Sequence, residues 1–272
     1  MVNKKYKLTA VSYLNTKPLL YGIFKSKIAE RIELQLNMPS VCAQKLQEGS
    51  ADIGLVPVAV IPELATPHII SDYCIGTVGA VQTVCLYGET PIENWNALYL
   101  DYQSRTSVEL TKVLLGEYWQ LHPTLLNAEP GYESKIAGRT GGLVIGDRTI
   151  GMNTRYPYVY DLGDIWMRHT GLPFVFAAWV SNRPLDAEFI AEFNEALAQG
   201  IAAIPELTFL LPEQQAGFDL ETYFTRHISY YLDNAKRHAL SLFLSKISPD
   251  APPPILQFDS LVQHEKNMIS VL

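Results

Sequence analysis

The chain has 272 residues, of which 48% are hydrophobic and 18% are charged. This balance is typical of a globular enzyme or binding protein, and the length permits one large domain or two smaller ones. The formal net charge of −7 argues against a broad nucleic-acid-binding surface, although local hydrogen-bond donors can still hold a small anion.

The hydropathy pattern does not suggest a membrane protein. No apolar run approaches the roughly 20 residues that a membrane-spanning helix needs. Lys4 and Lys5 lead into an alternating, strand-like segment and not into the apolar region of a signal peptide. We therefore expect a cytoplasmic protein with no membrane partner and no nucleic-acid partner.

The three cysteines, Cys42, Cys74 and Cys85, are odd in number, and no two of them have C-x-x-C spacing. Reduced thiols are the expected state, and a metal site built from them is not expected. Cys74 and Cys85 lie in apolar surroundings, which favours a role as small core residues.

The hydrophobic pattern of residues 1–90 predicts alternating strands and helices. Ser40 is the expected N-cap of a helix that stops at Gly49, and Pro57 ends an apolar strand at a cleft. The predicted strands cover residues 7–11, 32–38, 52–57, 69–74 and 81–87, and the predicted helices cover 18–26, 41–48 and 58–64.

After a turn at residues 89–93, a second set of elements begins. Residues 174–180 are apolar enough for a central strand, which would return the chain to the first lobe. The remainder has a helical pattern, with a proline-rich break at residues 249–254. The predicted strands cover residues 97–101, 142–147 and 174–180, and the predicted helices cover 106–119, a turn into a helix at 159–166, 186–204 and 221–246.

This order predicts an α/β protein with two lobes. We expect residues 1–90 and 181–272 to form the first lobe and residues 91–180 the second. Two connections between the lobes would form a hinge, and a hinge gives a central cleft that can close.

Two polar segments mark the expected cleft. Residues 11–19 follow a strand and feed a helix, and they include Ser12 and Asn15. Residues 103–107, with Ser104, Thr106 and Ser107, follow the strand that begins the second lobe. Polar strand ends that precede helices are where open α/β sheets hold ligands. Helix caps and turns use the same residue types, so a structural role and a ligand-binding role both stay open for these residues.

Five sequence blocks occur in a family order: VSYLNTKPL, PSVCAQKLQEGSADIGLVP, SRTSVELTKVLL, GDR and YDLGDIWMRHTGLPFVFAAW. Together they resemble the chorismate dehydratase family of the futalosine route to menaquinone. The resemblance implies a periplasmic-binding-protein-like (type II) fold with a hinged central cleft. It also implies a cytoplasmic lyase that converts chorismate to 3-enolpyruvylbenzoate and water without a cofactor or metal.

Chorismate carries two carboxylates, so its site needs two anion-binding subsites. Residues 104–107 are candidates for one subsite, and Ser40 or the loop at residues 12–15 for the other. Thr83 keeps a hydroxyl where the family more often has a basic residue followed by serine, whereas Gln82 lacks the charge. The expected substrate-binding residues are Tyr13, Ser40, Pro57, Thr83, Ser104, Arg105, Thr106, Ser107, Gly146 and Asp147.

The expected catalytic residues are Asn15 and Ser12. Dehydration removes a ring proton and the neighbouring hydroxyl, which requires a base. The matching blocks offer no histidine or glutamate in an obvious position, so we expect the enolpyruvyl carboxylate of the substrate to take the proton. Asn15 would orient that carboxylate or the departing hydroxyl, and Asp147 is the alternative base.

Two other functions stay open. A related enzyme, 1,4-dihydroxy-6-naphthoate synthase, shares the fold, but its first loop is more like Ser-Pro-Cys-Pro-Asn-Asp, whereas this chain has Ser-Tyr-Leu-Asn at residues 12–15. A non-catalytic binding protein for a small carboxylate is the second alternative, because fold alone does not fix function. The oligomeric state, monomer or homodimer, is left open.

Several aromatic residues are expected to serve packing alone. Trp166, Phe174, Phe176 and Trp179 are expected in the core. Tyr223, Tyr230 and Tyr231 are expected to pack a C-terminal helix.

Overall fold

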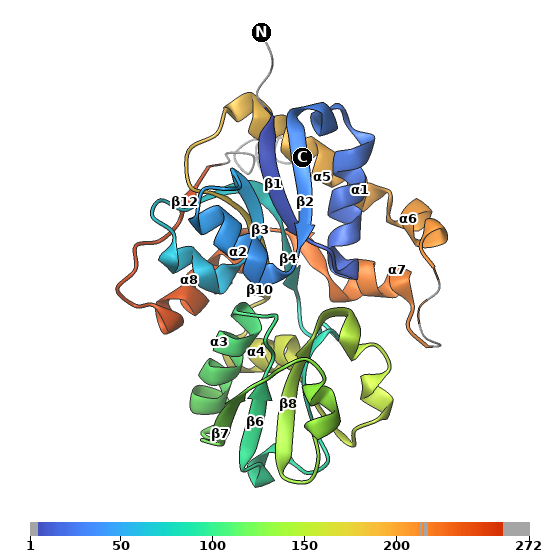
Figure 1. Cartoon of the computed structure of the whole chain (residues 1–272), viewed down its shortest axis with the longest axis vertical. Helices are drawn as coiled ribbons and strands as arrows, with labels where there is room; N and C mark the ends of the chain where they lie inside the picture. Colours follow the sequence, from blue (N-terminus) through green and yellow to red (C-terminus); the bar gives the residue numbers. More distant parts are fainter. Residues whose placement is uncertain (1–4, 213, 215–216, 258–272) are drawn as a thin grey trace, which may run out of the picture.

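Two β-sheets organise the chain, each in its own lobe (Figure 1). The structure, a computed structural model, describes residues 5–212, 214 and 217–257. The larger lobe has the strand order β11-β4-β10-β3-β1-β2, with β12 also paired to β4, and the smaller lobe has the order β7-β6-β8-β5-β9. The strands of the larger lobe are β1 (Tyr6–Val11), β2 (Ile32–Asn37), β3 (Ile53–Pro57), β4 (His68–Thr77), β10 (Phe174–Ser181), β11 (Ser229–Tyr231) and β12 (Ile255–Leu256). Those of the smaller lobe are β5 (Val84–Gly88), β6 (Ala97–Leu100), β7 (Thr124–Asn127), β8 (Thr140–Ile145) and β9 (Tyr158–Asp161).

Each sheet contains both parallel and antiparallel pairs of strands. β1 pairs in parallel with β2 and β3, while β10 runs antiparallel between β3 and β4. In the smaller lobe β6 pairs in parallel with β7 and β8, and β5 runs antiparallel between β8 and β9. The central position of β10 agrees with its prediction as a buried strand that returns the chain to the larger lobe.

Helices cover both faces of the larger sheet, with α1 and α5 on one side and α2 and α8 on the other (Figure 1). α1 and α5 cross at Gly22 and Gly200, where a Cβ on Gly22 would lie 1.9 Å from the Ala196 carbonyl oxygen. The helices are α1 (Lys17–Lys25), α2 (Pro39–Gln47), α3 (Thr106–Leu114), α4 (Leu162–Thr170), α5 (Ala187–Ala202), α6 (Ile204–Leu210), α7 (Leu220–Thr222) and α8 (Asn234–Ile247).

The chain crosses between lobes earlier than the expected divisions at residues 90 and 180. β5 at residues 84–88 belongs to the smaller sheet, and β10 at 174–181 belongs to the larger one. The crossings therefore fall in residues 78–83 and 171–173. β5 is apolar enough for either sheet, so its composition did not fix the sheet to which it belongs.

The expected single helix over residues 221–246 is wrong. A π-helical turn (Tyr223–His227) is followed by β11, which pairs with β4, and α8 then begins afresh. The Asp233 side chain accepts a hydrogen bond of 2.8 Å from the Lys236 backbone N–H, which caps the new helix. Ser40 is also not the N-cap of its helix, because Pro39 occupies the first helical turn and Met38 is the N-cap.

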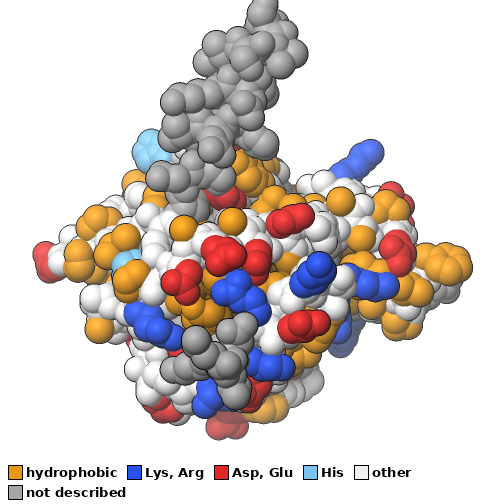
Figure 2. All heavy atoms as spheres, turned by 90° about the horizontal axis from the view of Figure 1, so that it is seen from above, with side chains coloured by type: hydrophobic (Ala, Val, Ile, Leu, Met, Phe, Trp, Pro, Cys, Tyr) orange, Lys and Arg blue, Asp and Glu red, His pale blue; other side chains and the backbone are white. Residues whose placement is uncertain are grey.

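One continuous apolar core runs through both lobes, and a smaller cluster lies within the second lobe. The three cysteines are free thiols buried in these cores. Figure 2 looks down on the larger lobe and shows Lys and Arg side chains beside Asp and Glu. Within the described ranges, no helix is both long and apolar enough to span a lipid bilayer.

Candidate active site

A pocket lies between the two lobes, with about 590 Å³ of space, part of it open to solvent, that protein atoms leave free. The sequence-predicted residues that line it are Tyr13, Asn15, Pro57, Thr83, Ser104, Thr106, Ser107 and Gly146.

The loop after β1 brings Asn15 to the pocket. A short 3-10 turn (Leu14–Thr16) precedes α1, and Pro18 in the first turn of α1 favours the helix start. The Asn15 Oδ1 atom accepts a hydrogen bond of 3.2 Å from Thr16 Oγ1, and the Asn15 carbonyl accepts one of 2.9 Å from the Tyr230 phenol. The loop is therefore anchored from behind, and the amide nitrogen of Asn15 remains available as a donor.

The start of α3 contributes hydroxyls from the other lobe. Ser104 Oγ accepts a hydrogen bond of 3.0 Å from the Ser107 N–H, so Ser104 serves as a cap of this helix. Thr106 Oγ1 donates to the Phe176 carbonyl at 3.0 Å and accepts from the Ala59 N–H at 3.2 Å. Thr106 thus fastens the smaller lobe to the larger one, whereas Ser107 lies at the pocket wall and at the positive end of the helix dipole.

Thr83 lies in the crossing between the lobes, beside an unusual backbone conformation. Gln82 has φ of +65°, which is uncommon for a residue with a side chain. The carboxylate of Asp161 accepts hydrogen bonds from the N–H groups of Val81 (3.1 Å) and Gln82 (2.6 Å), and also from the first turn of α4. Burial raises the pKa of Asp161, although these N–H donors oppose the rise. Asp161 thereby holds the crossing against α4.

Gly146 allows the two lobes to approach each other. Its φ of +65° lies in the region that favours glycine. A Cβ at this position would lie 3.2–3.3 Å from ring carbons of Tyr13. Both the backbone and the contact with Tyr13 therefore favour glycine at this position.

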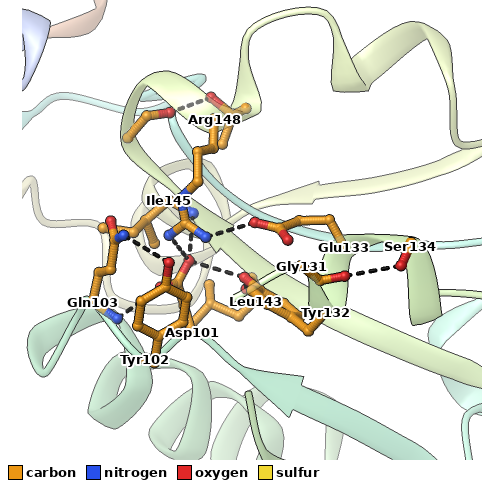
Figure 3. Close-up of polar contacts among 12 residues, drawn as sticks. Asp101, Tyr102, Gln103, Gly131, Tyr132, Glu133, Ser134, Leu143, Ile145 and Arg148 are labelled. Atoms are coloured by element: carbon orange, nitrogen blue, oxygen red, sulfur yellow. Dashed lines mark hydrogen bonds and ion pairs between the residues drawn. The ribbon is translucent and has the colours of Figure 1, made fainter. Parts of the chain in front are cut away.

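A buried carboxylate supports both pocket-lining loops of the smaller lobe (Figure 3). Asp101 accepts hydrogen bonds from the N–H groups of Gln103 (2.9 Å) and Ile145 (3.1 Å) and from the Tyr132 phenol (2.9 Å). Arg148 forms an ion pair with Asp101 at 2.5 Å. Gln103 precedes α3 and Ile145 precedes Gly146, so one side chain fixes the relative position of these two loops.

Four sequence-predicted residues lie outside the pocket lining. Ser12 is exposed, and Ser40 lies in the first turn of α2 behind Pro39, which does line the pocket. Arg105 points to the surface, where it forms a two-pronged ion pair with Glu63, with distances of 2.5 and 3.1 Å.

Asp147 is the fourth of these residues. Both of its carboxylate oxygens accept the Leu14 N–H, at 3.1 and 3.3 Å, across the interface between the lobes. Burial raises the pKa of Asp147, while this N–H and the nearby Lys17 oppose the rise. Its carboxylate is thus occupied with holding the loop that carries Asn15.

The pocket also includes residues that sequence reasoning assigned to packing. Phe176, which was expected only in the core, lines the pocket together with Ala177. Tyr223 lies behind the pocket, with its hydroxyl 2.9 Å from Thr83 Oγ1. No local pattern marks Tyr223, because its partner is 140 residues away in the chain.

The chemistry of the lining is neutral. Among the described residues that line the pocket, none carries a charged side chain. The hydroxyls of Ser104 and Ser107 and the Asn15 amide are donors that the lining offers, whereas the Thr106 hydroxyl and the Ser107 N–H already donate within the protein. Such donors can hold carboxylates where water is excluded. Hydrophobic side chains such as Phe176 and Leu55 supply the surface for a ring.

Solved structures with the same fold span nearly the whole chain. A structural-genomics protein from Archaeoglobus fulgidus has a TM-score of 0.68 at 15% identity and covers 90% of this chain and 97% of its own. A Candida albicans gene product described as having the generic periplasmic binding protein fold has a TM-score of 0.55 at 10% identity, with 94% and 98% covered. The aliphatic sulphonate binding protein of Escherichia coli has a TM-score of 0.54 at 15% identity, with 94% of each chain covered. The fold is therefore periplasmic-binding-protein-like.

Sequence comparison gives a closer relationship. A curated chorismate dehydratase of Thermus thermophilus is 26% identical over 211 residues, which cover 68% of this chain and 75% of the relative. Residues 6–249 match the model of a family described as menaquinone biosynthesis, and this match spans almost all of the described elements. The chain belongs to the menaquinone biosynthesis family.

Proposed function

We propose that this protein is a chorismate dehydratase, which eliminates water from chorismate to give 3-enolpyruvylbenzoate. Membership of the menaquinone biosynthesis family and the similarity to a chorismate dehydratase support this activity. The proposed reaction uses neither metal nor cofactor and takes place in the cytoplasm. The proposed partner is the small dicarboxylate substrate itself.

The observation that carries the proposal is the meeting of two donor sets in one pocket. Asn15 reaches the pocket from the larger lobe, while Ser104 and Ser107 reach it from the smaller lobe. A dicarboxylate that bridges these sets would hold the lobes together and exclude water from its ring. We assign one carboxylate to the start of α3 and the other to the loop that contains Asn15.

The proposed elimination needs a base for one ring proton. That proton lies on a carbon conjugated through a double bond to the ring carboxylate, so its removal gives a stabilised carbanion. Loss of the adjacent hydroxyl as water then leaves an aromatic ring, and the atoms balance as chorismate to product plus water. The lining carries no carboxylate or imidazole among its described residues, which favours the enolpyruvyl carboxylate of the substrate as base.

Asn15 has a defined part in this scheme. Its Oδ1 is held by Thr16, so its amide nitrogen is the atom directed at a ligand oxygen. We propose that it orients the enolpyruvyl carboxylate or the departing hydroxyl. Asp147 is less suited to act as the base, because the Leu14 N–H occupies its carboxylate.

The test is incubation of the purified protein with chorismate, followed by chromatography and mass analysis. The expected product is aromatic and lighter than chorismate by one water, and its formation should persist after dialysis against EDTA. Unchanged chorismate that co-purifies with the protein would instead favour a binding protein. Unchanged chorismate without binding, together with turnover of cyclised futalosine, would favour 1,4-dihydroxy-6-naphthoate synthase.

A further inference from the structure

A tyrosine from the C-terminal segment lies against the crossing between the lobes. Tyr223 begins the π-helical turn after α7, and its side chain is 1% exposed. Its phenol lies 2.9 Å from the hydroxyl of Thr83, which is also 1% exposed and lines the pocket. Two hydroxyls that are withdrawn from water must satisfy each other or a ligand.

The direction of this hydrogen bond follows from the acceptors that the two hydroxyls can reach. On distance alone, either oxygen could be the donor. Thr83 has a second acceptor for its proton, the Val81 carbonyl. Both buried protons therefore find an acceptor when the phenol of Tyr223 donates to Thr83 Oγ1 and Thr83 donates elsewhere.

The hydroxyl proton of Thr83 then has two possible acceptors. Within the described part of the chain, the acceptor for this proton is the Val81 carbonyl at 3.5 Å, a distance at the limit of a hydrogen bond. The alternative acceptor is a substrate oxygen in the pocket that Thr83 lines. A phenol that occupies the lone pair of Thr83 on the far side favours donation into the pocket.

We propose that Tyr223 is a positioning residue for the dehydration, which fixes the Thr83 hydroxyl as a hydrogen-bond donor to the substrate. This inference rests on the proposed function and deepens it. Tyr223 does not touch the substrate. It acts through Thr83 and so joins the C-terminal segment to the crossing, two parts of the chain that are remote in sequence.

The first test is Y223F, which keeps the ring and removes only the hydroxyl. We expect kcat for chorismate to fall about tenfold or more while KM changes by less than about threefold, because orientation matters more in the transition state than in the bound substrate. The matched control is Y87F. Tyr87 is also buried and its hydroxyl donates to Asn153 at 2.9 Å within the smaller lobe, so its loss should change kcat less than about twofold.

Variants of Thr83 test the route of the effect. T83S keeps the hydroxyl and should retain kcat, whereas T83V should lose about as much as Y223F. In the double variant T83V/Y223F, the loss should be close to that of T83V alone, because residues that act through one another are not additive. Fully additive losses would refute the coupling, and a T83V variant with the kcat of the wild type would refute the inference even if Y223F failed to fold.

The outcomes separate this inference from the proposed function. Turnover by the wild type together with unchanged kcat in Y223F would overturn the inference alone. A similar fall of kcat in Y223F and Y87F would also overturn the inference, because a general loss of packing would then explain both. A wild-type protein that does not convert chorismate would refute the proposed function, and this inference would fall with it.

Discussion

The phenol of Tyr13 donates a hydrogen bond of 2.5 Å to Oε1 of Gln103, and this bond joins the larger lobe to the smaller one beside the pocket that Tyr13 lines. Burial is the main cause that raises the pKa of Tyr13, so the phenol keeps its proton. On the other side, Gln103 is held through its backbone N–H by Asp101. The bond can form only when the lobes are close, so it contributes to closure of the pocket.

Replacement of Gln103 tests this contribution, because Gln103 is not a lining residue. Q103L removes the acceptor of this hydrogen bond, which contributes about 1 kcal/mol. We therefore expect the ratio of open to closed protein to rise about fivefold. KM for chorismate should rise by a similar factor with a smaller change in kcat, and the radius of gyration of the free protein in X-ray scattering should increase.

The control for Q103L is Y21F. Tyr21 donates at 2.5 Å to Glu206, and both residues lie on the surface of the larger lobe. Its loss should leave KM and the radius of gyration unchanged. If Q103L behaves like Y21F in both measurements, the bond between Tyr13 and Gln103 does not influence closure.

Asn15 should matter more for turnover than for binding. In N15A we expect kcat to fall about a hundredfold, since a polar group that orients reacting oxygens acts mainly in the transition state. The dissociation constant of chorismate, measured by calorimetry on a variant that no longer turns over, should rise less than about tenfold. N127A, at an exposed asparagine of β7, is the matched control and should match the wild type. Small and equal losses in kcat and binding would contradict the role of Asn15.

Local sequence patterns predicted the parts of the site that are local. The strand before Asn15 and the capped helix start near Ser104 are visible because a strand end and a helix cap are properties of adjacent residues. The order of the elements predicted two lobes and a cleft between them, and the resemblance to a known family added the class of chemistry. The site residues themselves stay predictions until variants are measured.

Long-range contacts limited what the sequence could predict. β5 is as apolar as a strand of the larger sheet, and only its pairing with β8 and β9 places it in the smaller one. Arg105 follows Ser104 in a polar motif, but the position of Glu63 on the other lobe draws it to the surface. Tyr223 has the spacing of a helix-packing residue, and its contact with Thr83 depends on the whole topology.

Asp147 provides the test between two bases. If the substrate carboxylate is the base, D147N should retain kcat within about tenfold, because an amide oxygen can still accept the Leu14 N–H. A loss of more than about a thousandfold would make Asp147 the base instead. Steady-state kinetics with chorismate, together with thermal unfolding to confirm an intact fold, distinguish the two outcomes.

The raised pKa of Asp147 also gives the stability of the protein a pH dependence. An unfolded aspartate titrates near about 3.9, and the folded protein holds this proton to a higher pH. Between the two values the native state binds more protons than the unfolded state, so stability falls as pH rises through that window. The free energy of unfolding of the wild type should therefore exceed that of D147N most at low pH. This difference should shrink as pH rises through the window.

Urea unfolding at a series of pH values from about 4 to about 6.5 measures this difference. The free energy of unfolding of the wild type minus that of D147N should decrease as pH rises, by about 1.4 kcal/mol for each unit by which the pKa is raised. D250N, at an exposed aspartate, is the control for the loss of one negative charge. A difference that increases with pH would mean that the folded protein stabilises the carboxylate and not the acid.

The ion pair of Asp101 and Arg148 should dominate the stability of the smaller lobe. The Asp101 side chain is 0% exposed and that of Arg148 is 26% exposed. D101A therefore leaves two N–H groups without their acceptor and a partly buried guanidinium with Glu133 as its remaining ion-pair partner. Removal of one partner from such a pair costs about 3–5 kcal/mol. The exposed pair of Arg168 and Asp164 is the matched contrast, and R168A should cost less than about 1 kcal/mol.

Chemical unfolding of D101A and R168A measures both losses. Kinetics then show whether the loss in D101A reaches the site: the backbone at Gln103 and Ile145 is released together, so KM for chorismate should rise in D101A and not in R168A. Equal losses of unfolding free energy in the two variants would mean that solvent screens the buried pair as effectively as the exposed one. A destabilised D101A with an unchanged KM would instead separate the stability of this lobe from the position of its two pocket loops.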